Sequence, residues 1–217
     1  MGVDAVQSVA VDERGLLGDR EWAVYDSARK LATGKHSRRF RRMDPVFTAS
    51  ARRDGDDTHV TLPGGVTVVA GTPEADAALS EHFGEPVSVR RETDIQHQDG
   101  ATFSIVGTAT LEELGRHEGD GRPVDPRHLR TNVVVATTEP FVEESWLGRE
   151  VRIGAVVVRV TETTERCRMV GVAQVGLAER PGMLKAISEH HDLNAGVYAT
   201  VVQPGTISLG DEVARGA

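Results

Sequence analysis

The chain has 217 residues, of which 39% are hydrophobic and 27% charged, and this excludes a disordered or fibrous protein and suits one larger or two small globular domains. Its 33 acidic and 25 basic residues give a net charge of -8, which opposes attraction to nucleic acid and to anionic membranes. No apolar run approaches the roughly 20 residues of a spanning helix, and residues 1–12 lack the pattern of a signal peptide. We therefore predict a cytoplasmic protein with no membrane or nucleic-acid partner.

Short strands dominate the first 70 residues. After the apolar alternation of Val6, Val9 and Val11, the segments Trp22–Tyr25 and Leu31 flank a polar turn, which predicts a hairpin. The stretch 46–51 is β-prone. A second hairpin is predicted at 59–69, because two β-branched runs flank Pro63-Gly64-Gly65.

Helix signals occur at three places. Thr72 before Pro73 predicts a capped helix start that Gly84 ends. Thr110-Leu111-Glu112-Glu113 has the spacing of a capping box and predicts a helix that ends near Gly115 to Gly119. A third helix is expected over 183–190.

The remaining apolar runs are short and β-branched, and Gly or Pro separates them: 102–106, 132–136, 151–153, 155–160, 197–202 and 206–209. Many short strands without βαβ alternation favour a barrel or sandwich, because closure removes sheet edges. We predict an α+β fold that is predominantly β. A polar stretch over 92–100 suggests two parts, an N-terminal β-rich segment at 1–92 and a C-terminal β-barrel domain at 93–217.

Nucleotide fingerprints are absent from the sequence, and Gly34-Lys35-His36-Ser37 is interpreted as a turn with a basic residue. His190-His191-Asp192 invites a metal interpretation, but adjacent histidines at a helix end point to different faces. A solvated helix end is the alternative.

Cys167 is the sole cysteine, which excludes an intrachain disulfide and an all-cysteine zinc site. It lies between Arg166 and Arg168, and flanking guanidinium groups favour the thiolate, the form that attacks electrophiles or ligates a soft metal. The alternative is a small buried hydrophobic side chain without chemistry.

Arg130-Thr131-Asn132 opens the apolar run Val133-Val134-Val135. An arginine at a strand start beside an asparagine amide can hold a phosphate, because the guanidinium offers two parallel donors. Arg130 can equally pair with Glu143 or Glu144. Asp19-Arg20 precedes the strand at Trp22 in the same manner, and by itself suggests only a surface ion pair.

In combination these segments resemble the MOSC domain, named for the C-terminal domain of molybdenum cofactor sulfurase, over nearly the whole chain. Gly15-Leu16-Leu17-Gly18-Asp19-Arg20-Glu21-Trp22 looks like the segment that precedes MOSC domains, and Arg127-His128-Leu129-Arg130-Thr131-Asn132 is similar to the family's Arg-Phe-Arg-Pro-Asn run. Phe141-Val142-Glu143-Glu144-Ser145-Trp146, Arg152-Ile153-Gly154, Arg166-Cys167 and Pro204-Gly205-Thr206-Ile207-Ser208-Leu209-Gly210-Asp211 follow in the family's order.

The resemblance implies a role for each matching residue. In the amidoxime-reducing members of the family, the cysteine at the position of Cys167 ligates molybdenum. The residues at the positions of Arg20, Asp99, Arg130 and Asn132 hold the pterin of the molybdenum cofactor. This implies an oxidoreductase that reduces small N-hydroxylated or N-oxygenated substrates. Its electrons would come from a separate protein, because no iron–sulfur cysteine set follows Asp211.

The sequence also departs from the family pattern. Gly100-Ala101 stands where hydroxyl residues usually follow the aspartate, Met169-Val170-Gly171-Val172 replaces a Thr-Thr-Val-Asp-Pro run, and the family's opening strand with its Lys-Ser pair has no counterpart at Met1-Gly2. The altered positions around Asp99 and Met169 motivate a second hypothesis, a molybdenum-free sulfur-transfer protein. In it Cys167 acts as a nucleophile or carries a persulfide received from a donor such as a cysteine desulfurase. A third hypothesis is a domain that binds the cofactor and passes it on.

Overall fold

The computed structural model describes residues 5–119 and 121–215 of the chain. These residues form two compact units. The first unit contains residues 20–99 and 172–179. The second contains the described residues of 5–19, 100–171 and 180–215.

The first unit contains two small sheets. The strands β3 (Trp22–Asp26), β4 (Leu31–Thr33), β5 (Phe40–Arg42) and β9 (Val87–Arg91) form a sheet in the order β5-β4-β3-β9. The predicted hairpin between β3 and β4 is confirmed, with Tyr25 opposite Leu31. Its turn is held by Asp26, whose Oδ1 accepts hydrogen bonds from the backbone N–H groups of Ala28 and Lys30. The turn closes because one carboxylate satisfies two of its donors.

The second sheet has the order β6-β7-β8, with β6 at Ser50–Asp54, β7 at Asp57–Thr61 and β8 at Thr67–Val69. The hairpin around Pro63-Gly64-Gly65 is confirmed, and both glycines have φ near +87°, a conformation that other residues rarely adopt. The predicted strand at 46–51 is wrong in its first half. Asp44–Phe47 is a short 3-10 helix, η1, because Pro45 fixes the first turn and Val46 and Phe47 turn into the core.

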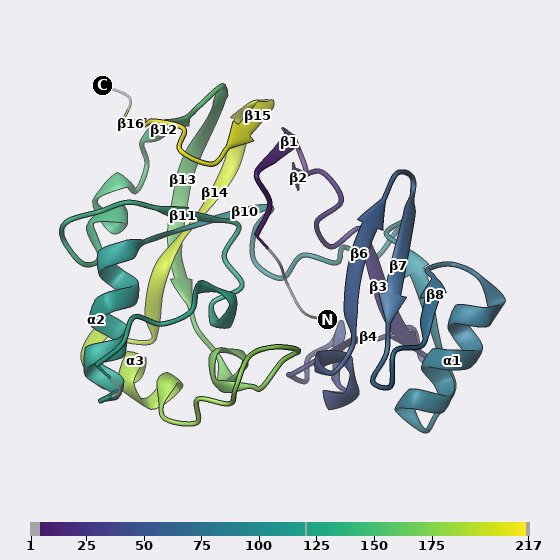
Figure 1. Cartoon of the computed structure of the whole chain (residues 1–217). Coiled ribbons are helices and arrows are strands. Elements are labelled where there is room, and N and C mark those ends of the chain that lie inside the picture. The colour runs from purple at the N-terminus through teal and green to yellow at the C-terminus, as the bar shows by residue number, and fades with distance from the viewer. Residues whose placement is uncertain (1–4, 120, 216–217) are drawn as a thin grey trace. The chain divides into compact units, whose positions relative to one another are not determined.

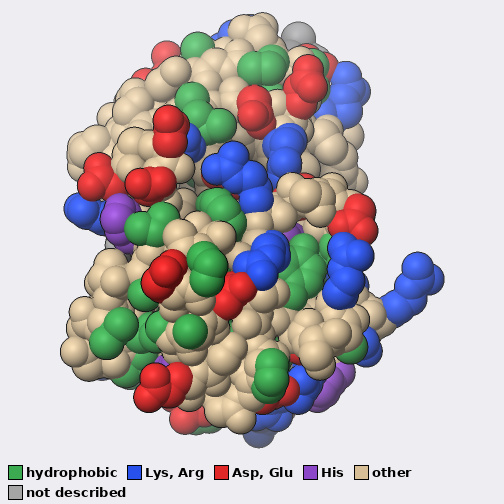
Figure 2. Space-filling view, turned by 90° about the vertical axis from the view of Figure 1, so that its right-hand side faces the viewer, with side chains coloured by type: hydrophobic (Ala, Val, Ile, Leu, Met, Phe, Trp, Pro, Cys, Tyr) green, Lys and Arg blue, Asp and Glu red, His purple; other side chains and the backbone are tan. Residues whose placement is uncertain are grey.

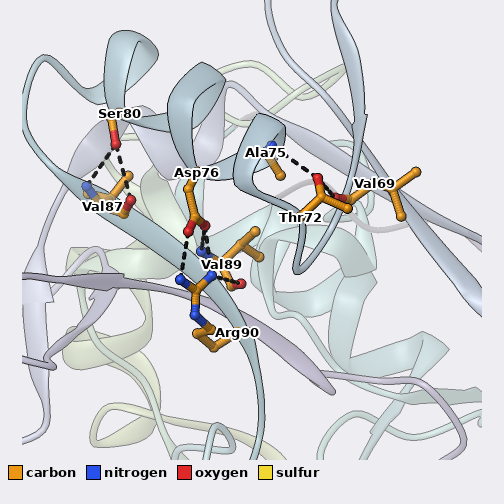
Figure 3. Close-up of polar contacts among 8 residues, drawn as sticks. All are labelled: Val69, Thr72, Ala75, Asp76, Ser80, Val87, Val89 and Arg90. Atoms are coloured by element: carbon orange, nitrogen blue, oxygen red, sulfur yellow. Dashed lines mark hydrogen bonds and ion pairs between the residues drawn. The ribbon is translucent and has the colours of Figure 1, made fainter.

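The helix α1 (Pro73–Phe83) begins and ends as predicted, with Thr72 as its N-cap and Gly84 in the left-handed conformation at its end. Figure 3 shows how α1 is joined to β9. Ser80 Oγ donates to the Val87 carbonyl and accepts from its N–H, while Asp76 accepts from the Val89 N–H and from the Arg90 guanidinium. Polar contacts therefore hold α1 on β9, in addition to the apolar packing between them.

Six strands of the second unit form its main sheet, in the order β11-β10-β14-β13-β12-β16. Their bounds are β10 (Phe103–Gly107), β11 (Val133–Val135), β12 (Glu150–Ile153), β13 (Val156–Glu165), β14 (Asn194–Gln203) and β16 (Val213–Arg215). The long strands β13 and β14 run side by side through this unit (Figure 1), and β10 pairs with β11 in parallel. A smaller sheet has the order β15-β1-β2, with β15 at Gly205–Ser208, β1 at Ser8–Asp12 and β2 at Gly15–Leu16.

The helices α2 (Thr108–Glu118) and α3 (Met183–His191) lie together in the second unit (Figure 1). The predicted capping box at Thr110 is wrong, because α2 begins two residues earlier with Gly107 as its N-cap. The Thr110 hydroxyl donates instead to the carboxylate of Glu143, at 2.9 Å from Oε1. A distant acidic residue thus takes the place of the expected local partner.

Apolar side chains of the main sheet form the principal core of the second unit, with Phe103, Ile105 and Val197 fully buried. In the first unit, Leu79 of α1 packs with Val60 and Val89 of the two sheets. The fold is a β-rich α+β structure, as predicted. No helix in the described part of the chain is long and apolar enough to cross a membrane.

Candidate functional site

Cys167 is a free, half-buried cysteine in the second unit. It follows the end of β13 and precedes the 3-10 helix η4 (Arg168–Gly171). The backbone on its N-terminal side is fixed, since the N–H of Arg166 donates to the Leu193 carbonyl at 2.7 Å. The partial exposure of Cys167 does not fit its interpretation as a small buried hydrophobic side chain.

The side chain of Arg166 bonds to two other segments of the second unit. Its Nη1 donates to the Leu129 carbonyl at 2.8 Å, and its Nε and Nη2 donate to the Ala195 carbonyl at 2.8 and 2.5 Å. Desolvation lowers the pKa of Arg166 to about 10, against the opposing effect of nearby Tyr198, Cys167 and Glu143. The guanidinium still carries its charge at neutral pH.

Arg130 directly follows Leu129, the residue whose carbonyl Arg166 binds. The preceding turn is the 3-10 helix η2 (Pro126–His128), which Asp125 caps through its side chain. Arg130 itself has φ +54°, and its N–H donates to the carbonyls of Pro126 and Arg127 at 3.2 Å. This uncommon left-handed conformation is of the kind that is often retained at functional sites.

Asn132 is held in one orientation by two partners. Its Oδ1 accepts from the Ser104 hydroxyl at 2.9 Å, and its Nδ2 donates to Asp19 Oδ2 at 2.8 Å. Because an amide nitrogen has two hydrogens, one N–H remains after the bond to Asp19. Next to it, the Thr131 hydroxyl oxygen is buried and has no hydrogen-bond partner in the described residues. The segment 130–132 thus combines a guanidinium, a fixed amide and an unpartnered hydroxyl.

The two glutamates suggested as ion-pair partners of Arg130 bind other groups. Glu143 is fully buried, and its carboxylate accepts from the Thr110 hydroxyl and from the Gly107 N–H at 3.1 Å. Glu144 contacts His191 Nε2 at 2.8 Å. The ion-pair interpretation of Arg130 with these residues is therefore wrong, since helix α2 and helix α3 supply their partners.

Arg20 and Asp99 lie in the first unit, on neighbouring segments. The buried His97, two residues before Asp99, donates from Nδ1 to the Arg20 carbonyl at 2.8 Å, and its Nε2 contacts the Tyr25 hydroxyl at 2.8 Å. Asp99 is exposed and pairs with Lys35, and its carbonyl accepts from Arg39 at 3.1 Å. Arg39 Nη2 also lies 3.9 Å from Asp99 Oδ1, so two cations accompany the Asp99 carboxylate.

The adjacent histidines of α3 do point to different partners, as the sequence indicated. His190 stacks on His117 with ring centroids 4.0 Å apart, whereas His191 stacks on Phe141 at 3.6 Å. Over the described ranges 5–119 and 121–215, no cluster of three His, Cys, Asp or Glu side chains could hold a metal ion. The metal interpretation of these histidines has no support in this arrangement.

Sequence reasoning missed several residues that hold the candidate site. Ser104 and Asp19 orient Asn132, and Lys35 accompanies Asp99, although Lys35 seemed to be only part of a turn. The role of the Arg166 side chain was also missed. Its position next to the sole cysteine was a signal, but its bond to Leu129 crosses 37 residues of sequence.

The fold and these residues define a class of protein. It is a β-rich α+β protein in which the segment of a half-buried thiol, Cys167, is hydrogen-bonded to the segment of Arg130, which precedes a strand. A comparison with known families matches residues 80–214, more than half of the chain, to the MOSC domain. The chain belongs to the MOSC domain family, which links it to molybdenum-cofactor-related proteins.

Solved structures with similar folds include the YuaD protein from Bacillus subtilis, with 15% identity, a TM-score of 0.51, and coverage of 97% of this chain and 85% of that one. YiiM from Geobacillus stearothermophilus matches with 19% identity and a TM-score of 0.43, over 54% of this chain and 55% of that one. The likeness to YuaD shows the fold. No curated protein matches the sequence.

Proposed function

We propose that this protein is a molybdenum-cofactor-binding oxidoreductase that reduces small N-hydroxylated or N-oxygenated substrates, with Cys167 as the metal ligand. The observation that carries the proposal is the Arg166 side chain, which ties the segment of Cys167 to the segment of Arg130. A ligand for a soft metal and a donor for an anion thereby belong to one hydrogen-bonded assembly. These are the two chemistries that this cofactor needs.

The donor set fits the cofactor. Its phosphate requires N–H donors, and the second unit offers the Arg130 guanidinium and the remaining N–H of Asn132. The buried Thr131 hydroxyl between them has no partner in the described residues, as expected of a group that a ligand satisfies. Molybdenum prefers a thiolate, and Cys167 is the sole thiol of the chain. In the first unit, Arg20 and Asp99 are the further candidates for pterin contacts.

Each residue has a separate task in this proposal. Cys167 holds the metal, Arg130 and Asn132 bind and orient the anionic end, and Ser104 and Asp19 keep the Asn132 amide from rotating. When bound, the cofactor supplies two-electron redox chemistry. Reduction of an N-hydroxylated amidine consumes two electrons and two protons and releases the amidine and water. The electrons would come from a separate electron-transfer protein.

The test is reduction of an N-hydroxylated amidine by protein loaded with the cofactor, with a chemical reductant in place of the natural donor. We expect amidine formation by the wild type and a loss of at least about tenfold in Arg130→Ala, since one charge-assisted bidentate contact contributes 1.5–3 kcal/mol, roughly. Arg152→Ala, at an exposed position of β12, is the matched control and keeps full activity.

Loss of fold does not explain the expected result, because arginine and alanine both carry a Cβ at the positive φ of position 130. The melting temperature of Arg130→Ala should therefore stay within a few degrees of the wild type, roughly. Equal activity of Arg130→Ala and the wild type would contradict the proposed anion contact. Loaded wild-type protein that reduces none of a panel of N-oxygenated compounds would contradict the reaction. Persulfide formation on Cys167 after incubation with a cysteine desulfurase would then favour sulfur transfer.

A further inference from the structure

We infer that Arg166 is a positioning residue that fixes the Cys167 thiol relative to the Arg130 segment. The functional importance of this positioning rests on the proposed function. The positioning itself can be measured in the protein without cofactor. Arg166 touches neither the substrate nor the metal in this account. It acts through the backbone of the residues that do.

The hydrogen bonds of Arg166 reach two segments, 193–195 and the segment of Leu129. Its backbone N–H binds Leu193, its Nε and Nη2 bind Ala195, and its Nη1 binds Leu129. Leu129 is the residue before Arg130, and Arg166 is the residue before Cys167. The Arg166 side chain therefore connects the residue directly before Cys167 to the residue directly before Arg130.

The geometry requires a guanidinium. The planar fork of arginine presents donors in two directions at once, whereas a lysine ammonium is one nitrogen on a flexible stem. The donors of Arg166 on opposite sides of the fork serve Ala195 and Leu129, which lie on different segments. Lysine keeps the charge at this position but cannot reproduce both sets of bonds.

The surroundings leave room for this fork. A Cβ added at Gly196 would lie 3.3 Å from Arg166 Nη2 and 2.6 Å from the Ile105 carbonyl oxygen. Gly196 also has φ +75°, which favours glycine. The glycine at position 196 of β14 therefore leaves space next to the Arg166 guanidinium and next to the Ile105 carbonyl of β10.

The experiment compares cofactor-free wild type with Arg166→Lys by amide hydrogen exchange and by alkylation of Cys167 with iodoacetamide, followed by intact mass. Cys167 is the sole cysteine, so the added mass reports one site. In Arg166→Lys we expect exchange at residues 129–132 and at 167–171 to rise together by about tenfold, and alkylation to accelerate by about threefold or more, because local opening becomes easier. Arg159→Lys, the same substitution on an exposed face of β13, is the control and should match the wild type.

Unchanged exchange in either segment would overturn the inference. A uniform rise across the second unit, including β12, would also overturn it, since that result indicates general destabilisation and no specific link. If Arg166→Lys does not fold, hydrogen exchange of the Arg166 Nε–H is measured by NMR in the wild type instead. We expect this N–H to be protected from exchange, and rapid exchange with water would contradict the inference. If the wild type takes up no cofactor, the proposed function is contradicted. The exchange and alkylation measurements still test the role of Arg166, because they use cofactor-free protein.

Discussion

His128 is a buried histidine in the segment that leads to Arg130, with 2% of its surface exposed. Desolvation lowers its pKa below the usual 6.5, and the charge of Arg180 acts in the same direction. Asp125, Glu118 and a hydrogen bond with the Val170 backbone oppose the shift but do not cancel it. The folded protein therefore prefers the neutral imidazole.

This preference predicts a loss of stability on acidification. As the pH falls through 6.5, the unfolded chain binds a proton that folded His128 resists, and each unit of pKa depression corresponds to about 1.4 kcal/mol. We expect His128→Gln to lose less stability than the wild type between pH 7.5 and pH 5.5. Urea unfolding at both pH values measures this, with His36→Gln on an exposed loop as the control. An identical pH dependence in wild type and His128→Gln would contradict the account.

At the residue scale, the local sequence singled out Cys167, Arg130 and Asn132 as candidate site residues but did not indicate the residues that hold them in place. The residue types carried their own signal, because a sole thiol between arginines and a guanidinium beside an amide are informative without a fold. The residues that hold them lie far away in the sequence, since Asp19 is 113 positions before Asn132. No local pattern encodes such a bond, because it exists only once the strands have paired.

At the element scale, the helix α1 was predictable and the start of α2 was not. Thr72, Pro73 and Gly84 give α1 local signals at both ends, and each acts within four residues. The apparent capping box of α2 failed because buried Glu143 competes for the Thr110 hydroxyl. Pro45 likewise produced a 3-10 turn where β-branched residues favoured a strand. A tertiary partner overrode the local signal at α2, whereas at η1 a proline overrode the strand propensity of its neighbours.

The junction of α1 and β9 also gives a prediction (Figure 3). Burial raises the pKa of Asp76, but the hydrogen bonds from Arg90 and from the Val89 N–H outweigh it, so the pKa lies below the usual 3.8. The ionised carboxylate therefore stabilises the fold above pH 3.8, and this contribution is lost as the pH falls below that value. We expect Asp76→Asn to lower the free energy of unfolding at pH 7 by about 1–2 kcal/mol.

The difference between Asp76→Asn and the wild type should shrink as the pH is lowered from 7 to values below 3.8, because the carboxylate then takes up its proton. Urea unfolding followed by circular dichroism measures it at each pH. Glu74→Gln, at an exposed position in the first turn of the same helix, is the control and should change stability less. A difference that stays constant across this range would show that Asp76 contributes through packing rather than through charge.

At the scale of the whole molecule, composition and strand pattern predicted the α+β, predominantly β class. The face in Figure 2 shows acidic and basic side chains interspersed, with no continuous basic surface. The net charge of -8 is the observation on which our prediction of no nucleic-acid partner rests. The order of strands in the main sheet could not be predicted, because β10 pairs with β14 across about 90 residues and no local signal specifies the partner.

Metal content shows whether Cys167 ligates molybdenum. The measurement is molybdenum per chain by mass spectrometry, on protein purified from a host that makes the cofactor, with Cys167→Ala prepared in parallel. We expect near-stoichiometric molybdenum in the wild type and its loss in Cys167→Ala, with the melting temperature of the variant close to that of the wild type. Equal molybdenum in both proteins, or none in the wild type, would contradict the account.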